Sequence, residues 1–371
     1  MTPQWDALLR SLRDPACMAG HSEATWDLLL RQALSAGVLA RLGALARAAG
    51  IEPSLPLAVR RQMRALLAVS EEQRRAVRWE LVMLSRDLGD LPGPIMLLKG
   101  AAYVAGDLPP APGRLFSDID ILVPHEQLDH AEAALMLGGW NSAAESAYDE
   151  RYYRQWMHEL PPLVHVRRQT NLDLHHNILP LTARIKTQSA PLLAAASRVA
   201  EFPRFSLPAP ADQVLHSATH LMHEGDWRHG LRDIADLDSL LRHHGSMPGF
   251  WNGLLARAAE LSLGRPLFYG LELCQTYLHT PVPEEALQRC PGRPGPLARA
   301  LMRALLRRAL TGAHRGSMAP GTQLAEFALY VRSHYLRMPL HLLLPHLIVK
   351  AVSRPSPNQA RSEDANPAQQ P

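Results

Sequence analysis

Two aspartates, Asp118 and Asp120, lie one residue apart in the apolar run "GRLFSDIDILVP" (113–124). A β-strand places residues i and i+2 on one face, so both carboxylates would point the same way while Ile119 and Ile121 enter a core. Two like charges this close repel each other, and burial increases the cost. A divalent cation removes that repulsion, and Mg²⁺ prefers carboxylate oxygens. The pair therefore predicts a Mg²⁺ or Mn²⁺ site, with a solvated strand edge as the alternative.

A glycine turn and a third acidic residue flank this pair. Lys99, Gly100 and Ala101 follow a short apolar strand and open a predicted helix. The backbone N–H groups and the dipole at such a turn favour phosphate, and glycine permits its close approach. Asp173, in "NLDLHH", lies on a later predicted strand. The glycine turn, the paired aspartates and Asp173 together indicate a binding site. Each of these features alone would be weak evidence for one.

Polar neighbours extend the candidate site. Lys99 and Arg114 are candidate phosphate ligands, the lysine as a point charge and the arginine as a fork, or else they solvate a loop rim. Ser117 either bonds a phosphate or starts the strand. His175 shares the predicted face of Asp173, where it either pairs with a carboxylate, contacts the ligand, or is a half-buried strand residue.

The elements that must position these residues change character along the chain. Apolar residues three to four apart predict helices throughout residues 1–90, including one long amphipathic helix over 56–90. Residues 91–205 mix short strands, a helix after Pro124 and a hairpin over 160–176, which predicts an α+β core with a small mixed sheet. Residues 206–352 are helical again. The tail, 353–371, has no large apolar side chain and is predicted to be disordered.

Composition limits the possible partners and location. The net charge is +4 and the basic residues form no cluster with interleaved aromatic residues, so a nucleic-acid partner is not expected. The three cysteines have no metal-ligand spacing, and no signal peptide is apparent, which favours the cytoplasm. The apolar segment 338–349 is too short to span a bilayer. We expect it to form a buried helix, with docking on a membrane surface or a partner as the alternative.

A rival cluster of chemically active side chains lies in the C-terminal helices. His216 and His220 have the i, i+4 spacing of zinc ligands, with His223 close by, but no HExxH glutamate, cysteine or adjacent His-Asp pair accompanies them. We expect these histidines to face the cleft beside the catalytic core or to pack as polar core. The following acidic residues indicate a solvated helix face, within which the first could be structural: Asp233, Asp236 and Asp238.

The stretch "LLKGAAYVAGDLPPAPGRLFSDIDILVP" (97–124), followed by "LDLHH", resembles the DNA polymerase β-type nucleotidyltransferase superfamily. More narrowly, it is similar to an uncharacterised bacterial nucleotidyltransferase family with "LLKG", "SDIDLLV" and "DLH" signatures. The segment "LHSATHLMHEGDWRHGLRDIADLDSLL" (215–241) is similar to that family's later part, so the likeness covers most of residues 20–350. Relatives of this kind are associated with exopolysaccharide and exosortase-type systems.

The resemblance implies a role for each candidate residue. Asp118 and Asp120 would hold metal ions that bind a nucleoside triphosphate, Asp173 would help to deprotonate the attacking hydroxyl, and Gly100 and Ala101 would lie against the β- and γ-phosphates. The acceptor would be a small molecule, a sugar or a protein, and pyrophosphate would leave. This chain departs from the superfamily in having Gly-Ala in place of Gly-Ser or Gly-Gly, and in a longer loop. A catalytically degenerate nucleotide-binding or scaffold protein is the alternative.

Overall fold

A computed structural model describes residues 3–144, 146–313, 318–343 and 345. Residues 344 and 346–349 of the predicted C-terminal apolar segment, and the whole of the predicted tail, 353–371, lie outside these residues. The described part combines helices with one mixed sheet, which confirms the predicted α+β class.

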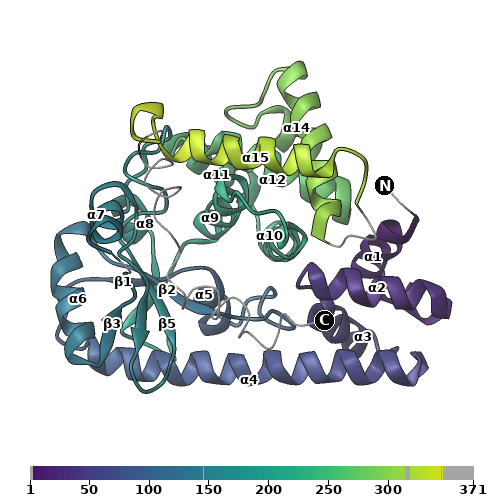
Figure 1. Ribbon diagram of the computed structural model, residues 1–371, viewed down its shortest axis with the longest axis horizontal. Coiled ribbons are helices and arrows are strands. Elements are labelled where there is room, and N and C mark those ends of the chain that lie inside the picture. The colour runs from purple at the N-terminus through teal and green to yellow at the C-terminus, as the bar shows by residue number, and fades with distance from the viewer. Residues whose placement is uncertain (1–2, 145, 314–317, 344, 346–371) are drawn as a thin grey trace.

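The N-terminal part of the chain is helical, as predicted: α1 (Pro3–Arg13), α2 (Glu23–Ser35), α3 (Leu39–Ala48) and α4 (Leu57–Asp87). The Ser22 hydroxyl caps α2 by accepting the Thr25 N–H at 3.3 Å. With 31 residues, α4 is about 46 Å long. It buries Val59, Met63 and Leu67 at intervals of four, the amphipathic spacing that its sequence predicts. It runs beneath both α3 and the sheet (Figure 1), so this one helix supports both parts of the molecule.

The sheet has the strand order β3-β4-β5-β2-β1-β7-β6. Its strands are β1 (Ile95–Leu97), β2 (Asp118–Leu122), β3 (Trp140–Ser142), β4 (Leu163–His165), β5 (Asn171–His175), β6 (Ser197–Arg198) and β7 (Phe205–Leu207). Strands β4 and β5 form the predicted antiparallel hairpin, whereas β5 runs parallel to the central strand β2. Strand β1 is antiparallel to β2, so the last residues of β1 and the first residues of β2 lie at the same end of the sheet.

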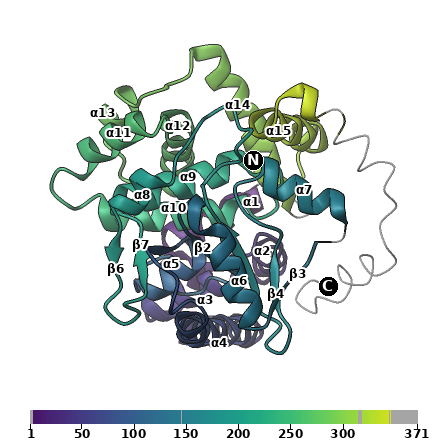
Figure 2. The ribbon, with the colours of Figure 1, turned by 90° about the vertical axis from the view of Figure 1, so that its left-hand side faces the viewer.

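Helices cover both faces of this sheet and complete the C-terminal part. Those within the sheet region are α5 (Lys99–Ala105), α6 (Leu128–Leu137), α7 (Ala147–Trp156) and α8 (Ala190–Ala194). Those that follow are α9 (Pro210–His223), α10 (Gly230–His244), α11 (Phe250–Glu260), α12 (Gly264–Leu273), α13 (Glu284–Gln288), α14 (Pro296–Ala309) and α15 (Thr322–Arg337). Helix α5 packs on both β2 and α9. Figure 2 views α4 nearly end-on, on the opposite side of the sheet from α9.

Among the described residues, no single helix is long and apolar enough to cross a membrane. Helices α2 and α3 reach that length and composition only together, and the chain bends by 116° between them.

The prediction that the acidic residues of α10 form a solvated helix face is wrong. This helix lies between α9 and the N-terminal helices (Figure 1), so its acidic side chains meet protein rather than water. The following carboxylates are all paired there: Asp233 with Arg232, Asp236 with Arg41 and Arg114, and Asp238 with Thr280 and Arg242.

Asp236 joins three distant segments. The carboxylate is buried and accepts hydrogen bonds from Arg41 on α3 and from Arg114, whose Nε lies 2.7 Å away. Arg41 also donates to the Pro110 carbonyl at 3.0 Å, which fixes the long loop between α5 and β2 against α3. Gly113 has a φ of +71°, and a Cβ there would lie 2.5 Å from the Arg41 Cα, so only glycine fits this close approach. The long loop is thus a packed connection between α3 and the sheet.

Candidate functional site

The predicted carboxylates come together at the end of the sheet where β1 ends and β2 begins. Asp120 lies opposite Asp173 in the parallel β2–β5 register, and Asp118 is two residues earlier on the same face. Ile119 and Ile121 point to the other face and are buried, as the alternation predicts. Asp120 is only 1% exposed, whereas Asp118 and Asp173 are half-buried. The acidic pair is therefore no solvated strand edge.

Two side chains share one oxygen of Asp120. Lys99 Nζ donates to Oδ1 at 2.6 Å, and His175 Nε2 lies 3.1 Å from the same atom. Burial opposes ionisation of Asp120, but these two groups outweigh it and hold its pKa below the ordinary value. For Lys99 the attraction of Asp120 outweighs burial and raises the pKa. The lysine is thus a cation bound to the carboxylate.

The turn after β1 places Lys99 but uses its small residues for packing. Lys99 starts α5 with a φ of +42°, a left-handed conformation that is uncommon for residues other than glycine. A Cβ on Gly100 would come within 2.8 Å of the Phe116 ring and 3.1 Å of Arg114 Nη1. Ala101 is fully buried. Glycine and alanine at these two positions are therefore also required by the packing of α5 against the loop.

Sequence reasoning missed Glu159 and His158, which lie beside the site. The chain after α7 pairs with the end of β5 through a bridge between Glu159 and His175. This pairing brings Glu159 Oε2 to 3.3 Å from His175 Nδ1, an ion-pair distance. His158 Nε2 lies 3.8 Å from the same carboxylate. Burial disfavours the imidazolium of His175, but Glu159 and Asp120 on its two sides raise its pKa.

The donor set fits a divalent cation. Ligand atoms of Asp120, Asp173 and His175 lie within 4.8 Å of one another, and a second such group joins His158 and Glu159 to the same His175. The first group, with Asp118 adjacent on β2, offers the carboxylate oxygens that Mg²⁺ and Mn²⁺ favour. Such a cation would be held by Asp118, Asp120 and Asp173, and Lys99 would then be free to turn toward an anionic ligand.

Asp173 predicts how metal binding depends on pH. Burial, with the charges of Asp120 and Glu159, raises the pKa of Asp173 to about 7. Because a proton competes with a metal for this carboxylate, Mn²⁺ affinity should rise about tenfold per pH unit up to pH 7 and level off above it. Calorimetric titration of the metal-free protein with Mn²⁺ between pH 5 and 8.5 measures this, and Asp173→Asn should remove the rise. A pH-independent affinity in the unmodified protein would contradict it.

The raised pKa of Asp173 also determines whether the folded protein becomes more or less stable as the pH rises. An unfolded aspartate loses its proton near its ordinary pKa of 3.8, whereas folded Asp173 keeps it to about pH 7. Between these values the folded state binds more protons, so Asp173 makes the metal-free protein less stable as the pH rises. Asp120, with its lowered pKa, is ionised throughout this window. A bound divalent cation would offset the loss.

Glu159 is expected to act through His175. Glu159→Ala leaves the His175 Nδ1 side without its carboxylate, so the Mn²⁺ affinity of the site should fall about tenfold, the size of effect that outer-shell partners usually show. Glu159→Gln keeps an oxygen that can accept from the imidazole and should retain most of the affinity. Glu150→Ala, which removes a pair with Arg154 on α7, is the matched control. Equal affinities for Glu159→Ala and Glu150→Ala would show that Glu159 has no such role.

The remaining predicted residues have different surroundings. Arg114 is tied to Asp236 and lies over the rings of Tyr103 and Phe116, so its guanidinium is already engaged. Ser117 is exposed at the start of β2 and hydrogen-bonds Asp118.

The α9 histidines are uncharged. Burial, and then the positive charge of Lys99, lowers the pKa of His216 to about 3 and that of His220 well below its ordinary value. Burial lowers the pKa of His223 to about 4, and its Nδ1 bonds the Thr219 carbonyl. Within the described residues, the clusters of metal-ligand size do not include these three histidines. They are buried or half-buried polar groups next to the charged site, in keeping with the expected cleft or polar core.

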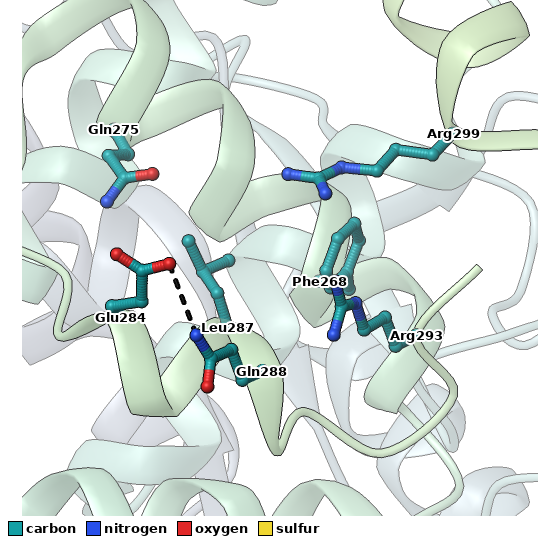
Figure 3. Close-up of a pocket in the computed structure, with 7 residues that line it drawn as sticks. All are labelled: Phe268, Gln275, Glu284, Leu287, Gln288, Arg293 and Arg299. Atoms are coloured by element: carbon teal, nitrogen blue, oxygen red, sulfur yellow. Dashed lines mark hydrogen bonds between the residues drawn. The ribbon is translucent and has the colours of Figure 1, made fainter. Parts of the chain in front are cut away.

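A small pocket of about 120 Å³ lies away from this site, among the C-terminal helices. Figure 3 shows Arg293 and Arg299 beside the Phe268 ring, opposite Glu284 and Gln288, which are joined by a hydrogen bond. The Arg299 guanidinium is paired with Glu272 outside the residues drawn. None of the predicted site residues lines this pocket.

The model of a family described as "uncharacterised nucleotidyltransferase" matches residues 22–279, which include the β1 turn, both carboxylate strands and helices α9 and α10. No curated protein matches the chain significantly.

Proposed function

Because the chain belongs to the uncharacterised nucleotidyltransferase family, we propose that it transfers a nucleoside monophosphate from a nucleoside triphosphate to a hydroxyl group, with a divalent metal. The observation that carries the proposal is the register that sets Asp120 beside Asp173, with Lys99 bound to Asp120 and Asp118 next to it. The acceptor is a small molecule, a sugar or a protein, and the reaction takes place in the cytoplasm.

Each residue has a chemical task in this proposal. Bound Mg²⁺ would neutralise the phosphates and stabilise the entering and leaving oxygens. Asp118 and Asp120 hold the cation through oxygens on one face of β2. Lys99 balances Asp120 before the nucleotide arrives and then donates to a phosphate oxygen as a point charge.

In the proposed transfer step, one P–O bond forms, one P–O bond breaks, and the hydroxyl proton is taken up by the protein. The acceptor oxygen attacks the α-phosphorus, a new P–O bond forms, and the bond from the α-phosphorus to the bridging oxygen breaks to release pyrophosphate. The hydroxyl proton passes to Asp173, which lies opposite Asp120 in the β2–β5 register. His175 and Glu159 fix the position of Asp120 during the step.

Labelled nucleotides test this proposal. The purified protein is incubated with each α-³²P-labelled nucleoside triphosphate, Mg²⁺ or Mn²⁺ and host lysate, and both pyrophosphate and labelled products are followed. We expect pyrophosphate release together with a labelled acceptor, both abolished by EDTA. Metal-dependent nucleotide binding without release would instead favour a degenerate nucleotide-binding or scaffold protein. Neither binding nor release with any nucleotide would overturn the proposed activity.

A further inference from the structure

Two histidines and a glutamate meet where the chain leaves α7 and crosses the end of β5. Ligand atoms of His158, Glu159 and His175 all lie within 4.8 Å of one another. The Oε2 atom of Glu159 is 3.3 Å from His175 Nδ1 and 3.8 Å from His158 Nε2. Two atoms that are each about 2.1 Å from a tetrahedral zinc ion lie about 3.4 Å apart. The three side chains therefore have nearly the spacing of metal ligands.

Hydrogen bonds do not account for this arrangement. His158 Nδ1 and His175 Nδ1 are both buried, and neither has a hydrogen-bond partner within the described residues. The contact between His175 and Glu159 has the distance of an ion pair without the geometry of a hydrogen bond. A buried polar atom without a partner is costly, and an ion that the atom can ligate removes that cost.

The backbone fixes these side chains in place. On one side of Glu159, the His158 carbonyl accepts the His176 N–H at 2.9 Å. On the other side, the Leu160 N–H donates to the Leu174 carbonyl at 3.0 Å. Both bonds tie the segment after α7 to β5 or to the residue directly after it. The three candidate ligands are thus carried by two paired stretches of backbone, which suits a metal site because little ordering remains to be done.

The donor atoms favour a transition metal over Mg²⁺. Mg²⁺ prefers six oxygen ligands, whereas Zn²⁺ takes imidazole nitrogen and carboxylate oxygen and is satisfied by four ligands. Two imidazoles and one carboxylate supply three of the four. The side chains of His158 and Glu159 are each 20% exposed, so an ion can enter from solvent and a water molecule can complete its coordination.

The His175 ring lies between this cluster and the carboxylate site. Its Nε2 is 3.1 Å from Asp120 Oδ1, so Nδ1 is the nitrogen that remains for a metal. A histidine that binds a metal almost always donates its other ring N–H to a carboxylate, a carbonyl or water, and Asp120 is placed to be that partner. The cluster and the carboxylate site are therefore adjacent but use different ligand atoms.

We propose that His158, Glu159 and His175 form a second metal site, which binds Zn²⁺ and lies beside the carboxylate site for Mg²⁺. The bound ion ties the segment after α7 to β5 and keeps the His175 Nε2 proton directed at Asp120. Zn²⁺ binding here does not depend on nucleotidyl transfer.

Metal titration tests the second site. The untagged, chelator-treated protein is titrated with Zn²⁺, and separately with Co²⁺ as a spectroscopic substitute, in an excess of Mg²⁺ that occupies oxygen-rich sites. We expect one ion per chain and the intense visible absorption of four-coordinate Co²⁺. His158→Ala should weaken Zn²⁺ binding about a hundredfold or more, because losing a ligand costs more than losing an outer-shell partner. The matched control is His125→Ala, which removes an exposed histidine whose ring packs on His176.

Further variants separate this site from the carboxylate site. Glu159→Ala removes another ligand and should also lose Zn²⁺, whereas Asp118→Asn should bind Zn²⁺ as the unmodified protein does. His158→Ala should keep the Mn²⁺ affinity of the carboxylate site. Zn²⁺ should raise the melting temperature of the unmodified protein and of Asp118→Asn, but not that of His158→Ala.

Three results would overturn the second site: no Zn²⁺ bound in the presence of Mg²⁺, Zn²⁺ binding that both His158→Ala and Glu159→Ala leave intact, or Zn²⁺ binding that Asp118→Asn abolishes. A protein that binds Zn²⁺ as expected but neither binds nucleotide nor releases pyrophosphate would support the second site and count against the proposed function alone.

Discussion

Replacement of Asp120 by asparagine should lower metal-dependent pyrophosphate release by about a thousandfold or more. The amide has nearly the same size, but it carries no charge and is a poor ligand for Mg²⁺. The change also leaves Lys99 without its buried counter-ion and removes the acceptor that His175 faces. Because the cation is needed to bind the triphosphate and to stabilise the transition state, turnover should fall far more than nucleotide affinity.

The measurement must separate lost chemistry from lost folding. Pyrophosphate release and nucleotide binding are measured for Asp120→Asn beside its circular dichroism spectrum and melting temperature. Asp118→Asn is the second variant, because Asp118 is half-buried and makes no ion pair within the described residues. Asp129→Asn, at an exposed position of α6, should behave as the unmodified protein. If folded Asp118→Asn and Asp120→Asn both released pyrophosphate at the unmodified rate, the catalytic assignment of the pair would be wrong.

The features of the site that sequence could predict are local ones. Strand alternation is a property of the backbone, so the shared face of Asp118 and Asp120, and the burial of Ile119 and Ile121, follow from spacing alone. The turn after β1 was predicted in the same way, from an apolar segment that ends at Lys99 and Gly100. The long α4 was predictable because its apolar stripe repeats over many turns.

The missed features depend on contacts between distant segments. Glu159 lies in a short extended segment with no repeating pattern, and only its pairing with the end of β5 brings it to His175. The polar appearance of α10 was misleading for the same reason. Asp236 has the spacing of a surface residue, but its partners Arg41 and Arg114 lie 195 and 122 residues earlier in the chain. No pattern within α10 contains that information.

Asp236→Ala should lower the free energy of unfolding by about 3–5 kcal/mol. The carboxylate is 3% exposed and is shared by two guanidinium groups that are themselves almost buried. Its removal leaves both arginines in a site of low polarity without a counter-charge, and that penalty exceeds what the intact network contributes to stability. It also loosens the contact between α3, the long loop and α10. Asp236→Asn, which can still accept from both arginines, should lose less.

Urea unfolding followed by circular dichroism measures these losses. The matched control is Asp226→Ala, which removes an exposed pair with Arg228 and should cost about 0–1 kcal/mol. The large loss of stability is expected to come from the two arginines that remain buried without a counter-ion. The double variant Arg41→Met, Asp236→Ala should therefore be more stable than Asp236→Ala alone, because one of these buried charges is removed together with its partner. A loss for Asp236→Ala no larger than that of the Asp226 control would mean that solvent reaches the network, and that α10 is not held to α3 through this carboxylate.

The network lies directly behind the turn of Gly100, where Arg114 Nη1 is 3.1 Å from the position a Cβ would take. Its disruption should therefore also displace Lys99 from Asp120, and activity should fall before the chain unfolds.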